Sequence, residues 1–310
     1  MTFVKTKTKD MNIVVTGSLG HISRPLTEKL LAKNHSVTVI SSRRERQAQI
    51  ESIGASAAIG TMKDLAFLTK TFSGADVVYL MEALGEGAFF DHALDVTKEI
   101  TEIGNLYFEA VKASGVKRVV HLSSIGAHTD KGVGLLQFHY NVENTLRKLP
   151  SDVSIKIMRP VGFYYNMLAF IPTIKKAGAI IQNYGGDEKE PWVSTADIAD
   201  VIAEEIGTPF NGTSIRYIAS DELSPNEIAA ILGQAIGRPD LEWHAVPDQK
   251  MLDSMTGAGM NPQTARLLVE MNASRRNGVL YEDYYRNRPV LGKRKVKDFA
   301  KEFAVVYNQE

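Results

Sequence analysis

The chain has 310 residues, 44% of them hydrophobic, which is enough to bury the core of one large α/β domain or of a main domain with a smaller lobe. Lys and Arg together number 36, as do Asp and Glu, so no overall field draws the chain to nucleic acid or to an anionic membrane. There is no cysteine, which excludes disulfides, thiol nucleophiles and thiolate metal sites and favours a reducing compartment.

The first ten residues are basic and precede an apolar run of only strand length, residues 11–16. A signal peptide needs a longer apolar stretch, and a membrane span needs roughly 18 uninterrupted apolar residues. We therefore expect a cytoplasmic protein without a membrane partner, whose first ten residues form an extension outside the fold.

From Asn12 onward, short apolar runs alternate with amphipathic stretches of helical length, which is the βαβ rhythm. The predicted strands are residues 12–17, 36–42, 56–60, 75–82, 116–124, 153–160 and 214–220. The predicted helices between them are residues 25–34, 44–54, 64–74, 91–114, 135–149 and 196–206. The strands are rich in β-branched residues and almost wholly apolar, as strands covered on both faces are.

This pattern predicts an α/β fold: a doubly wound parallel-sheet Rossmann domain with a smaller C-terminal lobe for substrate. The Rossmann domain is expected to span residues 11–158, with its sheet completed by about residues 195–219. Residues 159–194 and 220–310 are expected to form the lobe, which contains a helix at 225–237 and several charged helical pieces. Such a lobe would cover the crevice at the carboxyl ends of the strands, where open α/β sheets bind ligands.

A glycine turn follows the first strand, with Gly17, Gly20 and Ser23 at three-residue intervals before a helix. Gly17 permits a sharp turn, and Gly20 lets backbone approach a pyrophosphate at the positive end of the helix. The strand before the turn and the helix after it give this spacing the context of a dinucleotide site. The alternative is a tight turn that binds nothing.

After the second strand, an NAD site would be expected to carry Asp or Glu for the adenosine ribose, but this chain carries Ser41, Ser42, Arg43 and Arg44. Hydroxyls and guanidinium groups suit a 2′-phosphate, because the arginine fork matches phosphate geometry. The sequence therefore favours NADP(H). The alternative is that these arginines, with Arg46, form the solvated start of a helix.

Five segments together carry a resemblance to a known family: residues 14–23, 116–128, 139–149, 157–167 and 191–206. With them the sequence resembles the NmrA-like, atypical short-chain dehydrogenase/reductase family, especially its NADPH-dependent quinone oxidoreductase branch. The resemblance covers nearly the whole chain and implies a Rossmann domain with a small C-terminal lobe.

The resemblance also implies roles for individual residues around the coenzyme. The expected pyrophosphate loop is Gly17, Ser18, Leu19, Gly20, His21 and Ile22, and the expected ribose-phosphate ligands are Ser42, Arg43 and Arg44. Residues expected further along the coenzyme are Met81, Glu82, Ser123, Ser124 and Phe163. Tyr164 and Asn166 are expected on the substrate side, with Tyr164 a candidate catalytic residue, while the alternative for the aromatic residues is packing under the lobe.

One departure from the wider superfamily concerns its Tyr-x-x-x-Lys pair, in which the Tyr exchanges a proton. Alignment through Glu143 puts Leu135 at the Tyr position and His139 at the Lys position, while Tyr140 points to another helix face. His139 resembles the histidine of the quinone-reducing branch and is a candidate catalytic and coenzyme-binding residue. The alternative is a surface pair of His139 with Glu143.

We expect an enzyme that passes a hydride from NADPH to a quinone or similar conjugated carbonyl, a small molecule that stabilises the resulting anion itself. The alternative is a non-catalytic NADP(H) sensor that acts through a protein partner, because the fold alone does not decide between them. No metal is expected, since His21, His121 and His128 have no ligand spacing. The identity of the acceptor and the choice between monomer and homo-oligomer are left open.

Overall fold

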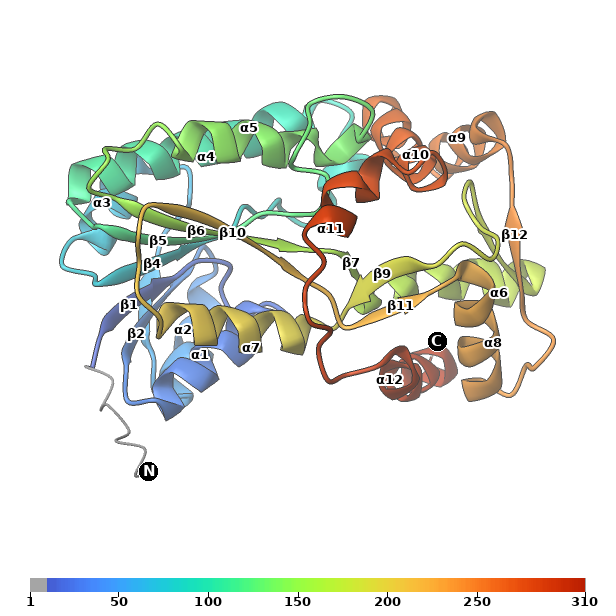
Figure 1. The fold of residues 1–310 in the computed structure, drawn as a ribbon, viewed down its shortest axis with the longest axis horizontal. Helices are drawn as coiled ribbons and strands as arrows, with labels where there is room; N and C mark the ends of the chain where they lie inside the picture. The colour runs from blue at the N-terminus through green and yellow to red at the C-terminus, as the bar shows by residue number, and fades with distance from the viewer. Residues whose placement is uncertain (1–9, 310) are drawn as a thin grey trace.

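The structure is a computed structural model that describes residues 10–309, so nearly all of the expected N-terminal extension lies outside the described residues. Its centre is a seven-stranded sheet in the order β10-β6-β5-β4-β1-β2-β3, and every pairing in it is parallel (Figure 1). The strands are β1 (Asn12–Val15), β2 (Ser36–Ser41), β3 (Ser56–Ile59), β4 (Val77–Leu80), β5 (Arg118–Leu122), β6 (Ser154–Pro160) and β10 (Thr213–Ile218). The predicted doubly wound parallel sheet is confirmed, and its order reverses between β1 and β4, where such sheets bind ligands.

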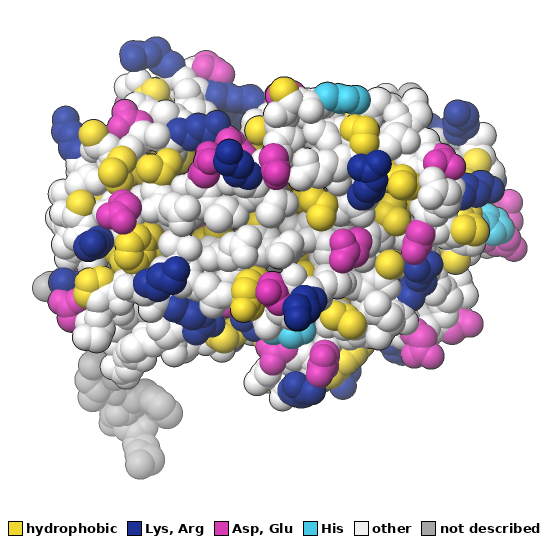
Figure 2. Space-filling model, turned by 90° about the horizontal axis from the view of Figure 1, so that it is seen from above, with side chains coloured by type: hydrophobic (Ala, Val, Ile, Leu, Met, Phe, Trp, Pro, Cys, Tyr) yellow, Lys and Arg dark blue, Asp and Glu magenta, His cyan; other side chains and the backbone are white. Residues whose placement is uncertain are grey.

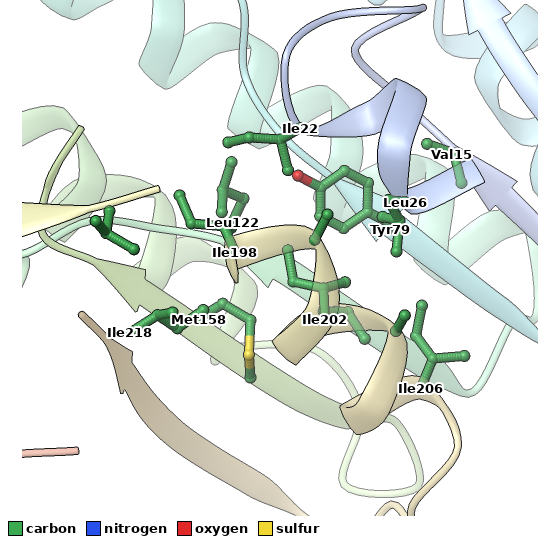
Figure 3. Packing of buried hydrophobic residues seen from close by; sticks show 14 of the residues in the cluster. Val15, Ile22, Leu26, Tyr79, Leu122, Met158, Ile198, Ile202, Ile206 and Ile218 are labelled. Atoms are coloured by element: carbon green, nitrogen blue, oxygen red, sulfur yellow. The ribbon is translucent and has the colours of Figure 1, made fainter. Parts of the chain in front are cut away.

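Helices cover both faces of this sheet. One face packs against α1 (Ser23–Ala32), α2 (Gln47–Ser52) and α7 (Thr195–Ile206), and the other against α3 (Leu65–Phe72), α4 (Val96–Ser114) and α5 (Gln137–Leu146). Figure 3 shows the first layer, where Leu26 of α1 and Ile202 of α7 meet Tyr79 of β4. Strand β4, in the middle of the sheet, is buried along its whole length and is wholly apolar, whereas the edge strands β3 and β10 are partly exposed.

Three helices begin two or more residues later than the sequence predicts. Helix α2 starts at Gln47, not at 44, because residues 44–46 form a 3-10 helix. Helix α4 starts at Val96, not at 91, because Asp95 caps it by accepting a hydrogen bond from the Lys98 N–H, and a short 3-10 turn, Ala88–Phe90, precedes it. Helix α5 covers Gln137–Leu146 and follows the 3-10 helix η3 (Gly134–Leu136), so the predicted helix over 135–149 is shorter. All three differences concern the ends of helices, where a side-chain cap or a 3-10 turn sets the boundary.

Short strands organise the lobe, which the sequence predicted as helical pieces only. One small sheet contains β7 (Gly162–Phe163), β9 (Glu190–Val193) and β11 (Asp221–Leu223), and a second pairs β8 (Ala179–Gln182) with β12 (Glu242–Ala245). The lobe helices are α6 (Ile171–Ala177), α8 (Pro225–Ala235), α9 (Asp248–Gly257), α10 (Pro262–Arg276), α11 (Glu282–Arg286) and α12 (Val296–Gln309), with the 3-10 helices η4 (Tyr164–Phe170) and η5 (Val279–Tyr281). Strands of two to four residues are too short to show a period of two.

Helix α10 approaches the main domain closely at Gly134 in η3. Gly134 has φ of 53°, and a Cβ there would lie 2.5 Å from the backbone nitrogen of Met271 in α10. The glycine therefore lets two backbones meet, which brings α10 over the carboxyl ends of the strands (Figure 1).

The surface agrees with the balanced composition. On the face drawn in Figure 2, basic and acidic side chains are interspersed, and the hydrophobic side chains are dispersed in small groups. Within residues 10–309, no helix combines the length and the apolar character needed to cross a membrane.

Candidate functional site

The glycine turn between β1 and α1 is held by hydrogen bonds to neighbouring strands. Gly17 has φ of 84° and Ser18 φ of 55°, and the Ser18 N–H donates to the Ile40 carbonyl of β2 at 3.1 Å. The Ser23 hydroxyl, in the place of a third glycine, donates to the Thr16 carbonyl at 2.9 Å. No side chain of the described residues caps α1 at Ile22, but the Arg24 N–H already donates to the Gly20 carbonyl at 3.0 Å and Pro25 has no N–H, so the N–H groups left for an anion are those of the turn that leads into the helix.

A cavity of about 520 Å³ adjoins this turn. It is lined by residues 17–20, 40–43, 60–63 and 83–85, together with Arg46, Glu99 and Ile103. The lining therefore brings together six residues that the sequence analysis placed at the coenzyme: Gly17, Ser18, Leu19, Gly20, Ser42 and Arg43. Arg44 is not part of the lining.

Three cationic side chains border the cavity. Arg43 Nη2 lies 3.0 Å from the Glu86 carboxylate, and both side chains are largely exposed. Arg46 donates to Gln49, and Lys63 pairs with Glu99. An anion entering here would meet Arg43 and Arg46, whose partners are exposed and exchange at little cost, and Lys63, whose partner Glu99 is only 16% exposed.

Met81 and Glu82 are the residues that follow β4. Met81 lies beside the glycine turn, and Glu82 points toward His121 of β5. The Met81 sulfur contacts Ser23, and the Met81 N–H donates to the Thr16 hydroxyl. The Glu82 carboxylate lies 3.2 Å from His121 Nε2, with both side chains almost wholly buried. Burial opposes a charged ring, but the Glu82 carboxylate outweighs it and raises the pKa of His121.

A second cavity, of about 190 Å³, lies where the ends of β5 and β6 meet the lobe. It brings together four of the predicted residues, Ser124, His139, Phe163 and Asn166. The rest of its lining is Ile125, Leu136, Val161, Gly162, Met271, Arg275, Leu280 and Tyr281. Ser123 lies behind this wall, buried, and donates to the Glu143 carboxylate at 2.5 Å.

His139 in this cavity is held neutral. Burial, followed by the nearby charges of His121 and Arg159, lowers the pKa of His139 to about 3. Its Nδ1 is buried without a hydrogen-bond partner in the described part of the chain. A neutral imidazole with a free nitrogen can bind a hydroxyl but cannot serve as a charged acid near neutral pH.

The structure separates Tyr164 from this group. Its ring is buried, its hydroxyl donates to the Arg294 carbonyl at 3.1 Å, and burial raises the pKa of the phenol. Tyr164 lines a third cavity of about 320 Å³, together with His21, whose ring centre lies 3.8 Å from that of Tyr165. Ile22 is a core residue.

A family model described as the NmrA-like family matches residues 9–281. The chain belongs to the NmrA-like family. A (4-alkanoyl-5-oxo-2,5-dihydrofuran-3-yl)methyl phosphate reductase of Streptomyces griseus subsp. griseus is 27% identical over 229 residues, which are 73% of this chain and 74% of that protein.

Solved structures share the fold of this NmrA-like chain. An NADPH-dependent quinone oxidoreductase of Escherichia coli, complexed with NADPH, superposes with a TM-score of 0.78 at 20% identity, over 94% of this chain and 99% of that one. Triphenylmethane reductase of Citrobacter sp., complexed with NADP(H), gives a TM-score of 0.72 at 17% identity, over 94% and 99% of the two chains.

Several residues of the NmrA-like site were missed by the sequence reasoning. Lys63 borders the first cavity, and Met271, Arg275, Leu280 and Tyr281 wall the second. Lys63 follows a predicted strand, so its position in a strand-end loop was a usable signal. The four lobe residues follow no parallel strand, and their sequence pattern gave no such signal.

Proposed function

We propose that this NmrA-like protein is an NADPH-dependent oxidoreductase that transfers a hydride to a quinone or a similar conjugated carbonyl acceptor. The observation that carries the proposal is the cavity at the switch point of the sheet, which combines a glycine turn, an uncapped helix and a cationic rim. The N–H groups of the turn that leads into α1 suit a pyrophosphate, and Ser42, Arg43 and Lys63 suit a 2′-phosphate. Since Arg44 lies outside that lining, we give it no part in phosphate binding.

The second cavity suits the nicotinamide end of the same coenzyme. In the sheet order, β4 separates β1 from β5 and β6, so a dinucleotide on the β1 turn extends along the strand ends toward Ser124 and His139. The neutral ring of His139 borders this cavity and suits a place beside the nicotinamide ribose, which gives His139 a positioning role. Phe163 and Asn166 border the space left for the acceptor.

When bound, NADPH supplies the hydride, and the chain supplies position and a dry cavity. Leu135, aligned with the superfamily tyrosine, is buried and apolar, and His139 is neutral, so neither offers a strong acid. A conjugated acceptor needs none, because it spreads the incoming charge over its own π system. We give Tyr164 no role in the reaction, since its hydroxyl is bound elsewhere.

The activities of the similar proteins support this proposal. They are a quinone oxidoreductase, a dye reductase and a furanone phosphate reductase, and two of these proteins were solved with NADPH or NADP(H). All three names describe reduction of an acceptor with an extended π system.

The test is NADPH oxidation by the purified protein against a panel of quinones and enones, with secondary alcohols and NADP⁺ as the contrasting reaction. We expect turnover of the conjugated acceptors and none of the alcohols, because alcohol oxidation needs a base that contributes about 10²–10⁴-fold. Robust alcohol oxidation would refute the assignment of the site. Binding of NADPH without oxidation by any acceptor would favour a coenzyme sensor instead.

A further inference from the structure

Arg275, the penultimate residue of α10, is the one cation that borders the second cavity among the residues described. Its side chain is only 10% exposed, and the pKa of the guanidinium is raised well above its usual range. Burial opposes the charge, but the Glu190 carboxylate outweighs it. The acceptor space is therefore bounded by a permanent positive charge that the sequence did not indicate.

The surroundings of Arg275 leave one edge of the guanidinium uncommitted. Nε donates to Glu190 Oε2 at 2.9 Å and Nη2 to Glu190 Oε1 at 2.6 Å. The guanidinium carbon lies 4.2 Å from the ring centre of Tyr184 and 4.7 Å from that of Trp192. Nη1 has no hydrogen-bond partner among residues 10–309, and it is not among their fully buried unpaired atoms.

The contacts also fix the group rigidly. Glu190 accepts a further hydrogen bond from the Tyr281 hydroxyl at 2.7 Å, and Tyr281 itself lines the cavity. Two aromatic contacts and a bidentate carboxylate leave the guanidinium little freedom. A donor held in this way before a reaction begins is what stabilisation of a developing charge requires.

We propose that Nη1 of Arg275 binds the carbonyl oxygen of the acceptor and stabilises the negative charge that forms there, so that Arg275 is a catalytic residue selecting carbonyl-conjugated acceptors. The inference rests on the proposed function, because it concerns the same reaction. It gives the site the electrostatic group that Leu135 and neutral His139 do not supply.

With NADPH bound, its nicotinamide C4–H bond would break and a C–H bond would form at the electrophilic carbon of the acceptor, so that NADPH would be oxidised to NADP⁺ and the acceptor reduced by two electrons. The π pair of the conjugated system moves to the carbonyl oxygen, which becomes an enolate or phenolate oxyanion beside Nη1. Arg275 keeps its protons, and a solvent proton neutralises the product.

The main variant is Arg275→Lys, which keeps a cation for Glu190 but removes the planar fork and its free Nη1. We expect the turnover number with quinones and enones to fall by about 10²-fold or more, as for loss of an oxyanion donor, with an unchanged Kd for NADPH. The matched control is Arg276→Met, because Arg276 is the next residue, pairs with Asp248 at the surface and does not line the cavity. This control should keep wild-type turnover.

A second variant guards against unfolding. Arg275→Met alone leaves the buried Glu190 without its cation, so it is combined with Glu190→Gln, which removes both charges. We expect this double variant to fold, as judged by circular dichroism and NADPH binding, and to show the same loss of turnover as Arg275→Lys.

A binding measurement separates this inference from the proposed function. Para-nitrophenol, titrated into the NADP⁺ complex, reports by its visible absorbance whether it binds as phenolate, a stable mimic of the oxyanion. The wild type and Arg276→Met should prefer the phenolate, and Arg275→Lys should reduce that preference by roughly tenfold or more.

The turnover and titration measurements test the role of Arg275 and the proposed function separately. Wild-type turnover and phenolate preference in both Arg275 variants would overturn the role of Arg275 and leave the proposed function intact. If the wild type oxidises NADPH with none of the acceptors, the proposed function fails, and the phenolate titration still decides whether Arg275 holds an oxyanion.

Discussion

Gly17 and Gly20 lie in one turn, yet replacing them with alanine should affect different quantities: the free energy of unfolding at Gly17 and the affinity for NADPH at Gly20. At Gly17 the φ of 84° costs an L residue about 1–2 kcal/mol. A Cβ there would also lie 2.6 Å from the Ser23 hydroxyl and 3.0 Å from Met81 Cγ, and overpacking of this kind costs about 1–3 kcal/mol. Gly17→Ala should therefore lower the free energy of unfolding of the coenzyme-free protein by about 2–5 kcal/mol.

At Gly20 a new Cβ would have one described atom within 4 Å, the Gly17 carbonyl oxygen at 3.1 Å. Gly20→Ala should change the free energy of unfolding by less than about 1 kcal/mol, but it places a methyl group where backbone must approach the pyrophosphate. We expect its Kd for NADPH to rise roughly tenfold or more, which is about 1.4 kcal/mol of binding free energy.

Urea denaturation and fluorescence titration with NADPH measure the two quantities separately. Gly74→Ala is the matched control, because Gly74 has φ of 80° with no atom within 4 Å of a new Cβ. It should show the backbone cost alone, about 1–2 kcal/mol. If Gly17→Ala costs no more than this control, the argument from overlap is wrong, and wild-type NADPH affinity in Gly20→Ala would place the pyrophosphate elsewhere.

Three further predictions follow from charged groups. Arg43→Ala should weaken NADPH by about 1.5 kcal/mol, the lower end for a hydrogen bond to a charged group because the side chain is half exposed, and leave NADH unchanged in calorimetry; equal losses would remove Arg43 from the phosphate site. The folded-state pKa of His139, about 3, lies below its ordinary 6.5, so stability falls as pH is lowered from 6.5 toward 3. Uptake of this one proton on unfolding makes the free energy of unfolding change by up to about 1.4 kcal/mol per pH unit. His139→Gln should lower the slope of the free energy of unfolding against pH by that amount, and an unchanged slope would mean that His139 becomes charged in the folded protein. Arg159→Met should lower the free energy of unfolding in urea by about 3 kcal/mol, the lower end for breaking a buried ion pair, because the buried Glu143 then keeps the partly exposed Arg147 as its cation, and a loss below about 1 kcal/mol would contradict this.

The first cavity, which we propose for the coenzyme phosphates, could be predicted because its residues are local in sequence. The glycine turn and Arg43 each follow a strand that can be read from its apolar run, and parallel strands bring their carboxyl ends to one edge. The second cavity, which we propose for the nicotinamide and the acceptor, could be predicted only in part. Asn166 in η4 lies three residues after Phe163, which precedes that helix, and because a 3-10 helix has three residues per turn the two line the same cavity while Tyr164 lines another.

The lobe residues could not be predicted, because their roles depend on contacts between distant segments. Arg275 is an ordinary residue of the last turn of a helix until Glu190, Tyr184 and Trp192 surround it. Those partners lie in and around β9, a strand too short to be predicted from its pattern.

Arg159 links two walls of the second cavity and so helps to hold them in place. It lies at the end of β6, donates to both carboxylate oxygens of Glu143 in α5, and donates to Asp283 in α11. Glu143 is one helical turn after His139, and Asp283 closely follows Tyr281, which bonds the carboxylate that holds Arg275. The wall with His139 and the wall with Arg275 are thus both tied to β6 through one buried guanidinium. Because preorganised groups act only when their spacing is held, a loosened Arg159 should reduce turnover even where the cavity residues themselves are unchanged.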